Sequence, residues 1–564
     1  MKSWRRGRYV AVAVVLMLGG CASRSPMSAS APEYYGTLHP FAADAVYFVV
    51  TDRFVNGDTG NDHRDQGGAM HSFDRPLHCP DGVIDNTGYL GGDFRGLLDH
   101  ADYIHDMGFG AVWITPIVDN PDEAFSGGGA ISCTSILTDR GKAGYHGYWG
   151  VNFYRLDEHL PSPGLDFAAL TRGLRGHGLK TVLDIVANHG SPGWSMPLEQ
   201  PGFGQIRAAD GSLIADHQNL PPEQLNPARE PLHRFFNTHG DLAQLSDLNE
   251  GNPAVMEYLV GAYLQWIDQG AAAFRIDTVP YLPTSFWKTF SDRIRARHPG
   301  FFMFGEAFKF KPEEIALYTW PEHGGLSMLD FPMKAALADV FQNPRSDYAR
   351  VAQALFVDAG PYQNPYELAT FYDNHDMARL QASDAGFIDA HNWLFTARGI
   401  PVIYYGSEIG FQRGHAEHHG NRNYFGTEGI DAALDHPIRR QLARVAKLRA
   451  ATPALQRGLQ LDLGIGGQRA AFLRVYQHAG VAQTALVLLN KGDARERFVL
   501  DALPRGHWRD AFGGGALDVA SGQGTALEVD AHDVGVWLLD APVDPSWTPR
   551  LAALMARPVV RNTP

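Results

Sequence analysis

The chain has 564 residues, of which 45% are hydrophobic and 20% are charged, so it can bury a large core and is expected to hold two or three domains. This composition excludes a mainly disordered protein. The formal net charge of −14 argues against unspecific binding to nucleic acid, because phosphate backbones attract clustered Lys and Arg.

The N-terminus has the pattern of an export signal. Basic residues precede an apolar run that ends at Gly20 and is too short to span a bilayer. Leu18, Gly19 and Gly20 before Cys21 resemble the lipobox of bacterial lipoproteins, which implies a signal peptide at 1–20 and a lipid on Cys21. The expected location is the outer membrane, facing the periplasm or the cell surface. A plain secretory signal with an incidental cysteine is the alternative.

Two further cysteines, Cys79 and Cys133, lie in loops punctuated by Gly and Pro. In an exported protein they can form one disulfide, and two free thiols are the alternative. A structural zinc site would need more ligands nearby.

From about residue 45, short β-rich segments alternate with amphipathic helical segments, which predicts a parallel sheet built from βα units. Eight such units indicate an α/β fold of the (β/α)8 TIM-barrel type, whose active site lies at the C-terminal ends of the strands. The eight strand candidates span 45–54, 110–117, 181–189, 272–279, 301–308, 326–331, 369–376 and 400–410.

Two segments interrupt this alternation. Residues 190–250 are rich in Pro, Gly and Asn and longer than an ordinary loop, which predicts an excursion domain after the third strand. Residues 453–545 lack helical periodicity, which predicts a C-terminal antiparallel β-sandwich. The rest of the expected organisation is a linker at 21–40, the catalytic barrel at 41–189 and 251–452, and a tail at 546–564.

Four of the strand candidates end in polar residues. Buried strands usually end in chemically inert residues, so these four ends indicate a site. Cleavage of a glycosidic bond needs one carboxylic acid to protonate the leaving oxygen and one carboxylate to attack or stabilise the sugar cation. Asp277 and Glu306 end neighbouring strands, which lie about 4.8 Å apart, so their carboxyls can approach the ~5 to 5.5 Å separation of a retaining enzyme. The full set is Asp184, Asn188, His189, Arg275, Asp277, Glu306, His375 and Asp376.

The neighbours of the two carboxyls predict different protonation states. Arg275 lies two residues before Asp277, on the same strand face, where its cation keeps Asp277 ionised. Glu306 follows an apolar stretch, which would raise its pKa and keep a proton available. A strand-end salt bridge or cap is the alternative for any one of these residues alone, whereas their joint occurrence favours a catalytic site.

These segments resemble the four signatures of the α-amylase family, glycoside hydrolase family 13. DIVANH, FRID, FGEA and DNHD occur in family order, and LSDLN (245–249) is similar to the short signature near the end of the excursion domain. The resemblance implies that Asp277 is the nucleophile, Glu306 the general acid/base and Asp376 the transition-state stabiliser. With the YHGYW segment, it also implies substrate contacts from His146, Tyr148, Trp149, His189, Arg275, His375 and Arg379.

The same resemblance implies bound Ca²⁺, a hard cation that prefers oxygen ligands. Asn188 and Asp247 would join the barrel to the excursion domain, together with the backbone carbonyl of Tyr281, which stands where the family usually has His. A second site is implied by similarity to bacterial amylases and cyclodextrin glucanotransferases, and an ordinary polar turn with helix capping is the alternative there. Its residues would be Asn56, Asp58, Asn61, Asp62, Gly91 and Asp93.

Departures from the family favour water over a sugar as the acceptor. Pro280 and Tyr281 replace a Lys-His pair that commonly holds the leaving-side sugars, and Ala243 stands where cyclodextrin glucanotransferases have an aromatic residue. Those enzymes also carry extra C-terminal domains, for which this chain has no room. The segment HAEHH (415–419) indicates a substrate-side loop at the cleft rim rather than a metal site.

The resulting hypothesis is a lipid-anchored, retaining α-amylase that cuts internal α-1,4 bonds of starch, maltodextrins and related α-glucans. A cyclomaltodextrinase or a cyclodextrin glucanotransferase-like transglycosylase is the alternative within enzymes, and a non-catalytic glucan-binding lipoprotein is the rival outside them. The expected partners are α-glucans, including cyclodextrins, and a membrane through the lipid alone. A monomer is favoured.

Overall fold

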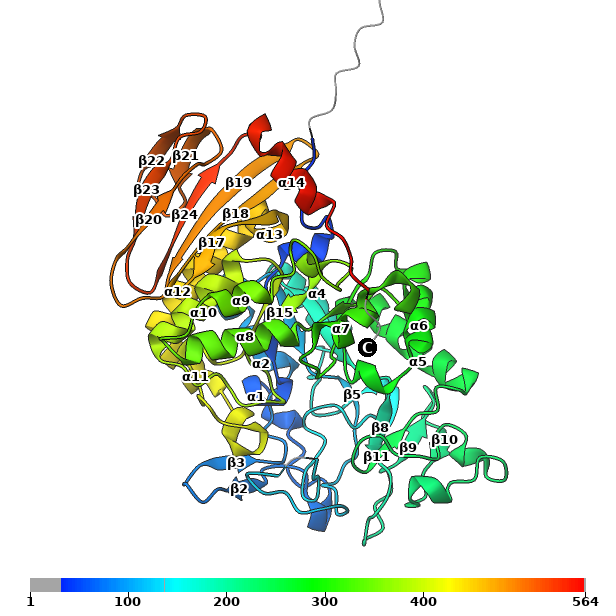
Figure 1. Cartoon of the computed structure of the whole chain (residues 1–564). Helices are drawn as coiled ribbons and strands as arrows, with labels where there is room; N and C mark the ends of the chain where they lie inside the picture. The colour runs from blue at the N-terminus through cyan, green and yellow to red at the C-terminus, as the bar shows by residue number, and fades with distance from the viewer. Residues whose placement is uncertain (1–31, 136, 562–564) are drawn as a thin grey trace, which may run out of the picture. The chain divides into compact units, whose positions relative to one another are not determined.

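The structure is a computed structural model that describes residues 32–135 and 137–561. Its central element is a sheet of eight parallel strands in the order β14-β13-β12-β7-β4-β1-β16-β15 (Figure 1). A parallel bridge between Leu329 and Ala369 links its two ends, so the sheet forms a nearly closed barrel and the predicted fold class is confirmed. The strands are β1 (Val46–Val49), β4 (Ala111–Ile114), β7 (Lys180–Ile185), β12 (Ala271–Ile276), β13 (Phe302–Gly305), β14 (Ser327–Met328), β15 (Ala369–Thr370) and β16 (Ile400–Tyr404).

The barrel strands are apolar along their length because both of their faces are buried. Every residue of β1 and β16 is buried. Phe48 of β1 pairs with Trp113 of β4 and with Tyr404 of β16, and its ring stacks on Trp113 at 3.8 Å between centroids. Such packing leaves the strand ends as the place for polar side chains.

Helices follow the strands, and their sequences carry ordinary start signals. Asn252 caps α5 by accepting a hydrogen bond from the N–H of Ala254, and Asp166 caps α4 through the N–H of Ala169. The helices are α1 (Thr51–Phe54), α2 (Phe94–Asp99), α3 (Ala101–His105), α4 (Phe167–Gly176), α5 (Pro253–Asp268), α6 (Thr284–Arg297), α7 (Pro312–Ala316), α8 (Phe331–Gln342), α9 (Ala349–Gln353), α10 (Asp384–Thr396), α11 (Gly426–Ala433), α12 (Pro437–Ala450), α13 (Pro453–Arg457) and α14 (Thr548–Met555).

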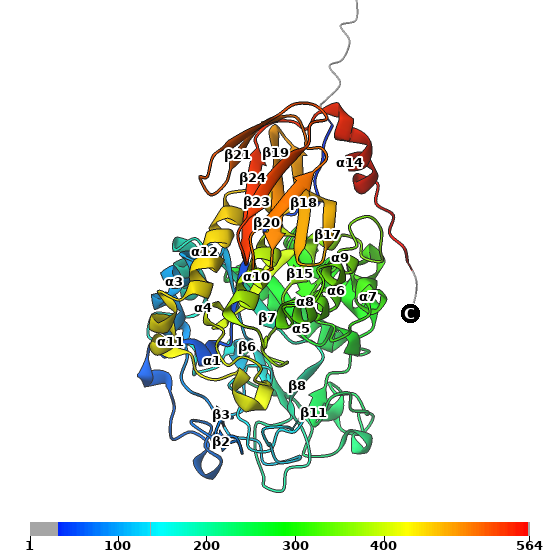
Figure 2. The ribbon, with the colours of Figure 1, turned by 60° about the vertical axis from the view of Figure 1, so that its left-hand side comes forward.

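Three excursions follow the carboxyl ends of β1, β4 and β7 and lie at the same end of the barrel (Figures 1 and 2). A disulfide between Cys79 and Cys133 joins the first to the second. In the third, Asp247 pairs with His189 across two short strands. The excursion strands are β2 (Pro76–His78), β3 (Ile84–Asn86), β5 (Val118–Asp119), β6 (Asn152–Leu156), β8 (His189–Pro192), β9 (Gln205–Arg207), β10 (Leu213–Asp216) and β11 (Leu245–Asp247).

The C-terminal part is antiparallel, with a six-stranded sheet in the order β17-β18-β19-β24-β21-β22 and a β20–β23 pair. Buried Arg474 of β18 ties this sheet to the barrel, because its Nη1 donates to the carbonyl of Thr396 at 2.7 Å. The strands are β17 (Leu459–Gly466), β18 (Arg469–His478), β19 (Val481–Asn490), β20 (Glu496–Leu500), β21 (Gly506–Asp510), β22 (Ala516–Val519), β23 (Thr525–Val529) and β24 (Asp533–Leu539).

Both terminal segments contact this body where they are described. Tyr34 is buried and pairs with Gln477, within the segment expected to be a linker. In the segment expected to be a tail, Arg557 donates to the carbonyls of Phe356 and Tyr362 at 2.7 and 2.9 Å. The expected signal peptide and Cys21 lie outside the described residues. Across 32–135 and 137–561, no helix combines the length and apolarity that crossing a membrane requires.

Candidate active site

Asp277 and Glu306 come together at the carboxyl ends of β12 and β13, on the wall of a cleft of about 650 Å³. One guanidinium contacts both: Nη1 of Arg275 is 2.8 Å from Oδ1 of Asp277, and Nη2 is 2.8 Å from Oε2 of Glu306. The two carboxyls therefore face a common hollow. Other lining residues are Leu137, Asp139, Lys142, His146, Tyr148, Trp149, His189, Leu242, Ala243, Tyr281, Phe308, Lys309, His375, Asp376, Glu417 and Arg422.

Arg275 is fully buried, and a third carboxyl group, that of Asp184, also contacts its guanidinium. Its Nη1 lies 2.9 Å from Oδ1 of Asp184, and Oδ2 of Asp184 accepts hydrogen bonds from Tyr148 Oη at 2.8 Å and Trp113 Nε1 at 3.0 Å. Burial raises the pKa of Asp184 to about 7, against the opposing effect of Arg275. Asp184 was visible at a strand end in the sequence, but its contact with Arg275 depends on the neighbouring strand.

The environment of Glu306 favours its protonated form. Burial raises the pKa of Glu306 to about 8, and nearby Asp376 and Asp277 add to this rise while Arg275 opposes it. Burial also raises the pKa of Asp376, to about 6, with Arg422 opposing. Near neutral pH the site therefore holds a protonated Glu306 beside an ionised Asp376, the division of states that acid–base chemistry needs.

His375 lies between the carboxyl group of Asp376 and the ring of Tyr148. His375 Nε2 lies 3.3 Å from Asp376 Oδ2 and 2.9 Å from Tyr148 Oη, and the Tyr148 and His375 rings stack at 5.5 Å. Burial lowers the pKa of His375 well below its usual range, with Arg422 and Arg275 adding to the effect.

The other predicted substrate residues of the YHGYW segment and of β8 line the same cleft. His146, Trp149 and His189 are each at most 4% exposed and lie in its wall. Burial is the main cause that lowers the pKa of both His146 and His189, so these rings are neutral near pH 7. Neutral imidazoles can donate hydrogen bonds to hydroxyl groups.

Arg379 is a correction to the sequence-based prediction, because the structure puts it outside the cleft. It is 1% exposed, and its Nε and Nη1 donate to the carbonyls of Asn421 and Tyr405 at 2.9 and 2.8 Å. The guanidinium also lies 4.1 Å from the ring centroid of Tyr404. Arg379 therefore contacts other parts of the protein and does not reach a substrate in the cleft. The arginine that faces the cleft is Arg422, which sequence reasoning did not find.

The first predicted calcium set fits a cation. Asn188 and Asp247 are both 2% exposed, and Asp247 Oδ2 accepts from the N–H of Asp241 at 2.6 Å. Oδ1 of Asp247 and one amide atom of Asn188 lack a partner among the described residues, and the two ends of an amide can exchange places. Tyr281 is 42% exposed and lies in the cleft wall.

The second predicted set also brings its oxygen atoms together. Asn56 Nδ2 donates to Asp62 Oδ1 at 2.7 Å, and the buried Oδ1 atoms of Asn56 and Asn61 are without a partner in the part of the chain described. A Cβ on Gly91 would collide with Asn56 and Asp62, so only glycine allows this approach. The carboxylate of Asp93 accepts from the N–H groups of Asp58, at 2.8 Å, and Gly96, at 2.7 Å, and so also caps α2.

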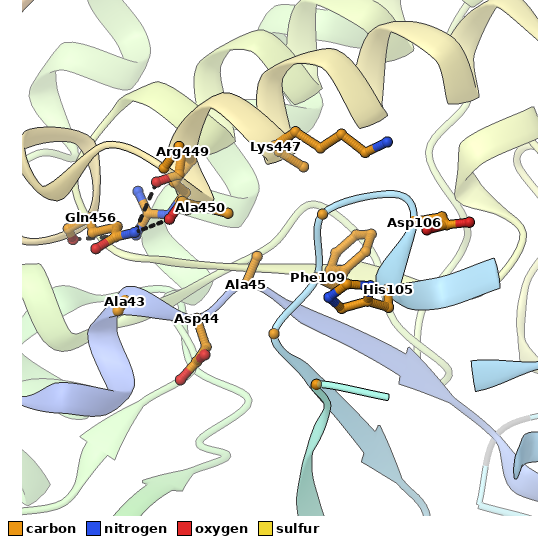
Figure 3. Close-up of a pocket in the computed structure, with 15 residues that line it drawn as sticks. Ala43, Asp44, Ala45, His105, Asp106, Phe109, Lys447, Arg449, Ala450 and Gln456 are labelled. Atoms are coloured by element: carbon orange, nitrogen blue, oxygen red, sulfur yellow. Dashed lines mark hydrogen bonds between the residues drawn. The ribbon is translucent and has the colours of Figure 1, made fainter. Parts of the chain in front are cut away.

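A different cavity, of about 480 Å³, lies near the residues that precede β1 and β4 (Figure 3). Arg449 and Gln456 are hydrogen-bonded to each other in its wall, and Asp44 pairs with Lys180 at 2.5 Å. Arg449 also donates to the carbonyls of Leu455 and Gly399. These groups hold backbone segments together at the end of the barrel away from the carboxyl pair.

Comparison with known proteins decides the family. The family described as "Alpha amylase, catalytic domain" matches residues 48–441. The chain belongs to the α-amylase family. It is therefore an enzyme of the glycoside hydrolase and transglycosylase class, as the sequence predicted.

Its relatives include both hydrolases and transferases. A cyclomaltodextrin glucanotransferase from Geobacillus stearothermophilus is 29% identical over 525 residues, covering 89% of this chain and 68% of that protein. The structure of an α-amylase from Geobacillus thermoleovorans, complexed with acarbose, aligns with a TM-score of 0.65 and 26% identity, covering 89% of this chain and 99% of that one.

A cyclomaltodextrin glucanotransferase with a three-domain ABC distribution corrects one sequence argument. Its structure aligns with a TM-score of 0.70 and 28% identity, and the alignment covers 88% of this chain and 99% of the glucanotransferase. The absence of room for extra C-terminal domains therefore does not argue against a transferase. The choice between the two activities must come from the cleft.

Proposed function

We propose that this enzyme hydrolyses internal α-1,4-glucosidic bonds of starch-derived glucans with retention of the anomeric configuration. The observation that carries the proposal is the pair Asp277 and Glu306 on one guanidinium, with the proton held on Glu306. A retaining glycosidase needs this arrangement of one carboxylate and one carboxylic acid.

In the proposed first step, a carboxylate oxygen of Asp277 bonds to the anomeric carbon while the glycosidic C–O bond breaks. The electron pair of that bond goes to the leaving oxygen, which takes the proton of Glu306. In the second step, Glu306 removes a proton from water, the water oxygen bonds to the anomeric carbon, and Asp277 leaves as a carboxylate. Both residues return to their starting states.

The remaining cleft residues act on charge and orientation in this proposal. Arg275 holds the carboxyl group of Asp277 in place through its 2.8 Å contact, and the same nitrogen of Arg275 contacts Asp184. Asp376 stabilises the positive charge that develops on the sugar ring. Tyr148 presents its ring to the sugar, and the neutral histidines 146, 189 and 375 donate to its hydroxyl groups.

Calcium and an export route belong to the same proposal. Ca²⁺ would be held by Asn188 and Asp247 at one site and by the loop at 56–62 at the other, where it would neutralise clustered oxygen atoms and tie excursions to the barrel. Lipid attachment at Cys21, with an outer-membrane location, follows only from the N-terminal sequence pattern.

Glucan transfer is the second candidate, favoured by the cyclomaltodextrin glucanotransferases among the relatives. Phe308 is 50% exposed in the cleft wall, and such a ring can hold an acceptor sugar. Ala243 and Pro280 line the cleft where an aromatic residue and a lysine would grip longer glucans in such enzymes. Without these two side chains we expect weaker binding of an acceptor sugar, which favours water as the acceptor.

Time courses on defined maltooligosaccharides and on amylose test the proposal, with anomers followed by proton NMR. We expect linear products of intermediate length that first appear as α-anomers. Initial β-anomers would overturn retention, and cyclic products would favour transfer. Glu306→Gln should lower kcat by about 10²–10⁴-fold and keep glucan binding, whereas Glu257→Gln, an exposed carboxylate on α5, should change neither. Binding without turnover by the native chain would identify a non-catalytic protein.

A further inference from the structure

The wall of the cleft beside Asp376 is built from Arg422, Glu417 and Lys142. Nη2 of Arg422 lies 2.8 Å from Asp376 Oδ1, and its Nε donates to the backbone carbonyl of His375 at 2.9 Å. Arg422 thus holds both the side chain of Asp376 and the backbone that precedes it. The Arg422 side chain is only 5% exposed, whereas that of Asp376 is 29% exposed, so the cation is buried and the carboxylate still faces the cleft.

Glu417 contacts the same nitrogen of Arg422 that contacts Asp376. Its Oε1 lies 3.0 Å from Nη2 of Arg422 and 3.7 Å from Nζ of Lys142, which also pairs with Asp139 at 2.9 Å. Two buried cations therefore share one carboxylate. Removing the partner of a buried charge is costly, so both cations would have to rearrange without it.

Glu417 stands where separate parts of the chain meet. It begins the short irregular segment η11 (Glu417–Asn421), whose middle residues are not helical and which follows β16, while Lys142 comes from the excursion after β4. The excursion after β1 braces the same segment, because Asp81 Oδ2 lies 2.7 Å from His419 Nε2. A residue in this position can be held firmly although it lies outside the barrel strands.

We propose that Glu417 is a positioning residue that fixes Arg422 on Asp376 and thereby sets the place and charge of the Asp376 carboxylate in the cleft. The inference rests on the proposed function, which gives Asp376 a part in the transition state. Nη2 of Arg422 contacts both carboxylates, so the orientation of the planar guanidinium toward Asp376 depends on Glu417 as well.

The electrostatics of the cluster agree with this role. Arg422, Lys142 and His418 lower the pKa of Glu417 to about 2 despite its burial, so it stays ionised at working pH. Burial raises the pKa of Asp376 to about 6, and Arg422 is the first influence that opposes the rise. The charge of Glu417 itself raises the pKa of Asp376, as does that of Asp277, whereas Arg275 lowers it, and Asp85 acts near Glu417. Arg422 has a larger effect on Asp376 than Glu417 has, so a displaced Arg422 would leave Asp376 harder to ionise even without the charge of Glu417.

Kinetics of Glu417→Gln over a pH series test the inference, because Gln keeps the size and removes the charge. We expect kcat to fall about tenfold with a smaller change in KM, and the acid limb of the kcat profile to move up by about 0.5 to 1 pH unit. Glu417→Asp should recover part of both. Glu428→Gln, an exposed carboxylate on nearby α11, is the matched control and should behave as the native chain does.

A Glu417→Gln enzyme with native kcat and an unmoved acid limb overturns the inference, as does a loss of Tm without movement of that limb. If this variant does not fold, Arg422→Lys decides, because Lys keeps the charge but cannot contact Asp376, Glu417 and the His375 carbonyl together. It should show the same upward movement, and a native profile would overturn the inference. Asp376→Asn separates the two proposals, since native kcat in that variant contradicts the proposed function instead.

Discussion

Nη2 of Arg275 lies 2.8 Å from Oε2 of Glu306, and the pKa of Glu306 is nevertheless raised to about 8. Burial outweighs the cation, and the neighbouring carboxyls of Asp376, Asp277 and Asp184 act in the same direction as burial. Arg275 contacts three carboxyl groups, so its positive charge is shared among them and stabilises the ionised form of each one less. One arginine thus keeps the cluster together without ionising its acid.

This balance predicts a bell-shaped pH dependence of kcat/KM. Activity should fall as pH rises through about 8, because Glu306 then loses the proton that the leaving group needs. It should also fall as pH drops through about 6, because Asp376 becomes protonated and loses its charge. Initial rates on maltoheptaose between pH 4.5 and 10 measure both limbs, whose apparent pKa values belong to the coupled carboxyls together. A rate that stays constant from pH 7 to 10 would contradict the assignment of Glu306 as the acid.

Removal of calcium should lower Tm and spare the fold of the barrel core. A site filled at 100 times its Kd contributes about 2.7 kcal/mol, so a chelator should lower Tm by a few degrees and added Ca²⁺ should restore it. Asp247→Asn should reduce this response and the number of ions bound, both read by calorimetry. Asp210→Asn, an exposed aspartate of the same excursion, is the control. An equal response to chelator in Asp247→Asn and the native chain would exclude Asp247 as a ligand.

The Cys79–Cys133 disulfide should stabilise the two excursions that it joins. It closes a loop of 54 residues, for which loop entropy predicts about 4 kcal/mol. The double variant Cys79→Ser/Cys133→Ser should therefore melt about 4 °C lower, if the chain unfolds as one unit of this length. Dithiothreitol should lower the Tm of the native chain by a similar amount and leave that of the variant unchanged. A reductant effect of equal size on both would place its cause elsewhere.

The barrel and its carboxyl pair were predictable because they depend on local pattern and on one rule of topology. Asp277 and Glu306 end strands that must be neighbours in a parallel barrel, so their proximity follows from sequence order. The arginines show where this reasoning stops. Arg379 lies three residues after Asp376, yet its guanidinium turns to backbone carbonyls, whereas Arg422 reaches the cleft from a segment without a regular period.

The same limit applies to the charged cleft wall. Lys142 and Glu417 are far apart in the sequence, and neither belongs to a strand or a regular α-helix. Their meeting depends on how the excursion after β4 and the segment after β16 fold over the barrel, which composition and spacing do not encode. The Cys79–Cys133 disulfide could be predicted because the chain has so few cysteines. The sequence did not predict that Cys79 lies beside η11, with its Sγ 3.9 Å from the carbonyl oxygen of His418.

A histidine joins the C-terminal sheet to the barrel and predicts a pH-dependent stability. Nδ1 of His532, before β24, lies 2.8 Å from Oδ2 of Asp389 on α10, and its Nε2 lies 3.1 Å from Oδ1 of Asp493. The hydrogen bond to Asp389 is the main cause that raises the pKa of His532 to about 9. Burial raises the pKa of Asp389 to about 6, so between these values the pair is ionised on both sides.

The sign of the effect follows from the histidine. Its pKa in the folded chain is above the unfolded value of about 6.5, so its stabilising contribution is complete below pH 6.5 and disappears as pH rises through about 9. The native chain should therefore lose Tm between pH 6.5 and 9.5, and His532→Gln, which does not titrate, should lose about 1–3 °C less. Differential scanning calorimetry at both pH values measures this difference.

His507→Gln is the matched control for this prediction. His507 of β21 also pairs with an aspartate, Nδ1 to Asp518 Oδ1 at 2.8 Å, but its side chain is 67% exposed against 24% for His532. An exposed pair contributes little to stability because water screens it, so this variant should keep the native dependence of Tm on pH. If His507→Gln and His532→Gln flatten the Tm profile equally, the contact between the C-terminal sheet and α10 is not what titrates. If only His532→Gln flattens the dependence of Tm on pH, the contact between His532 and Asp389 is the one that is lost at alkaline pH.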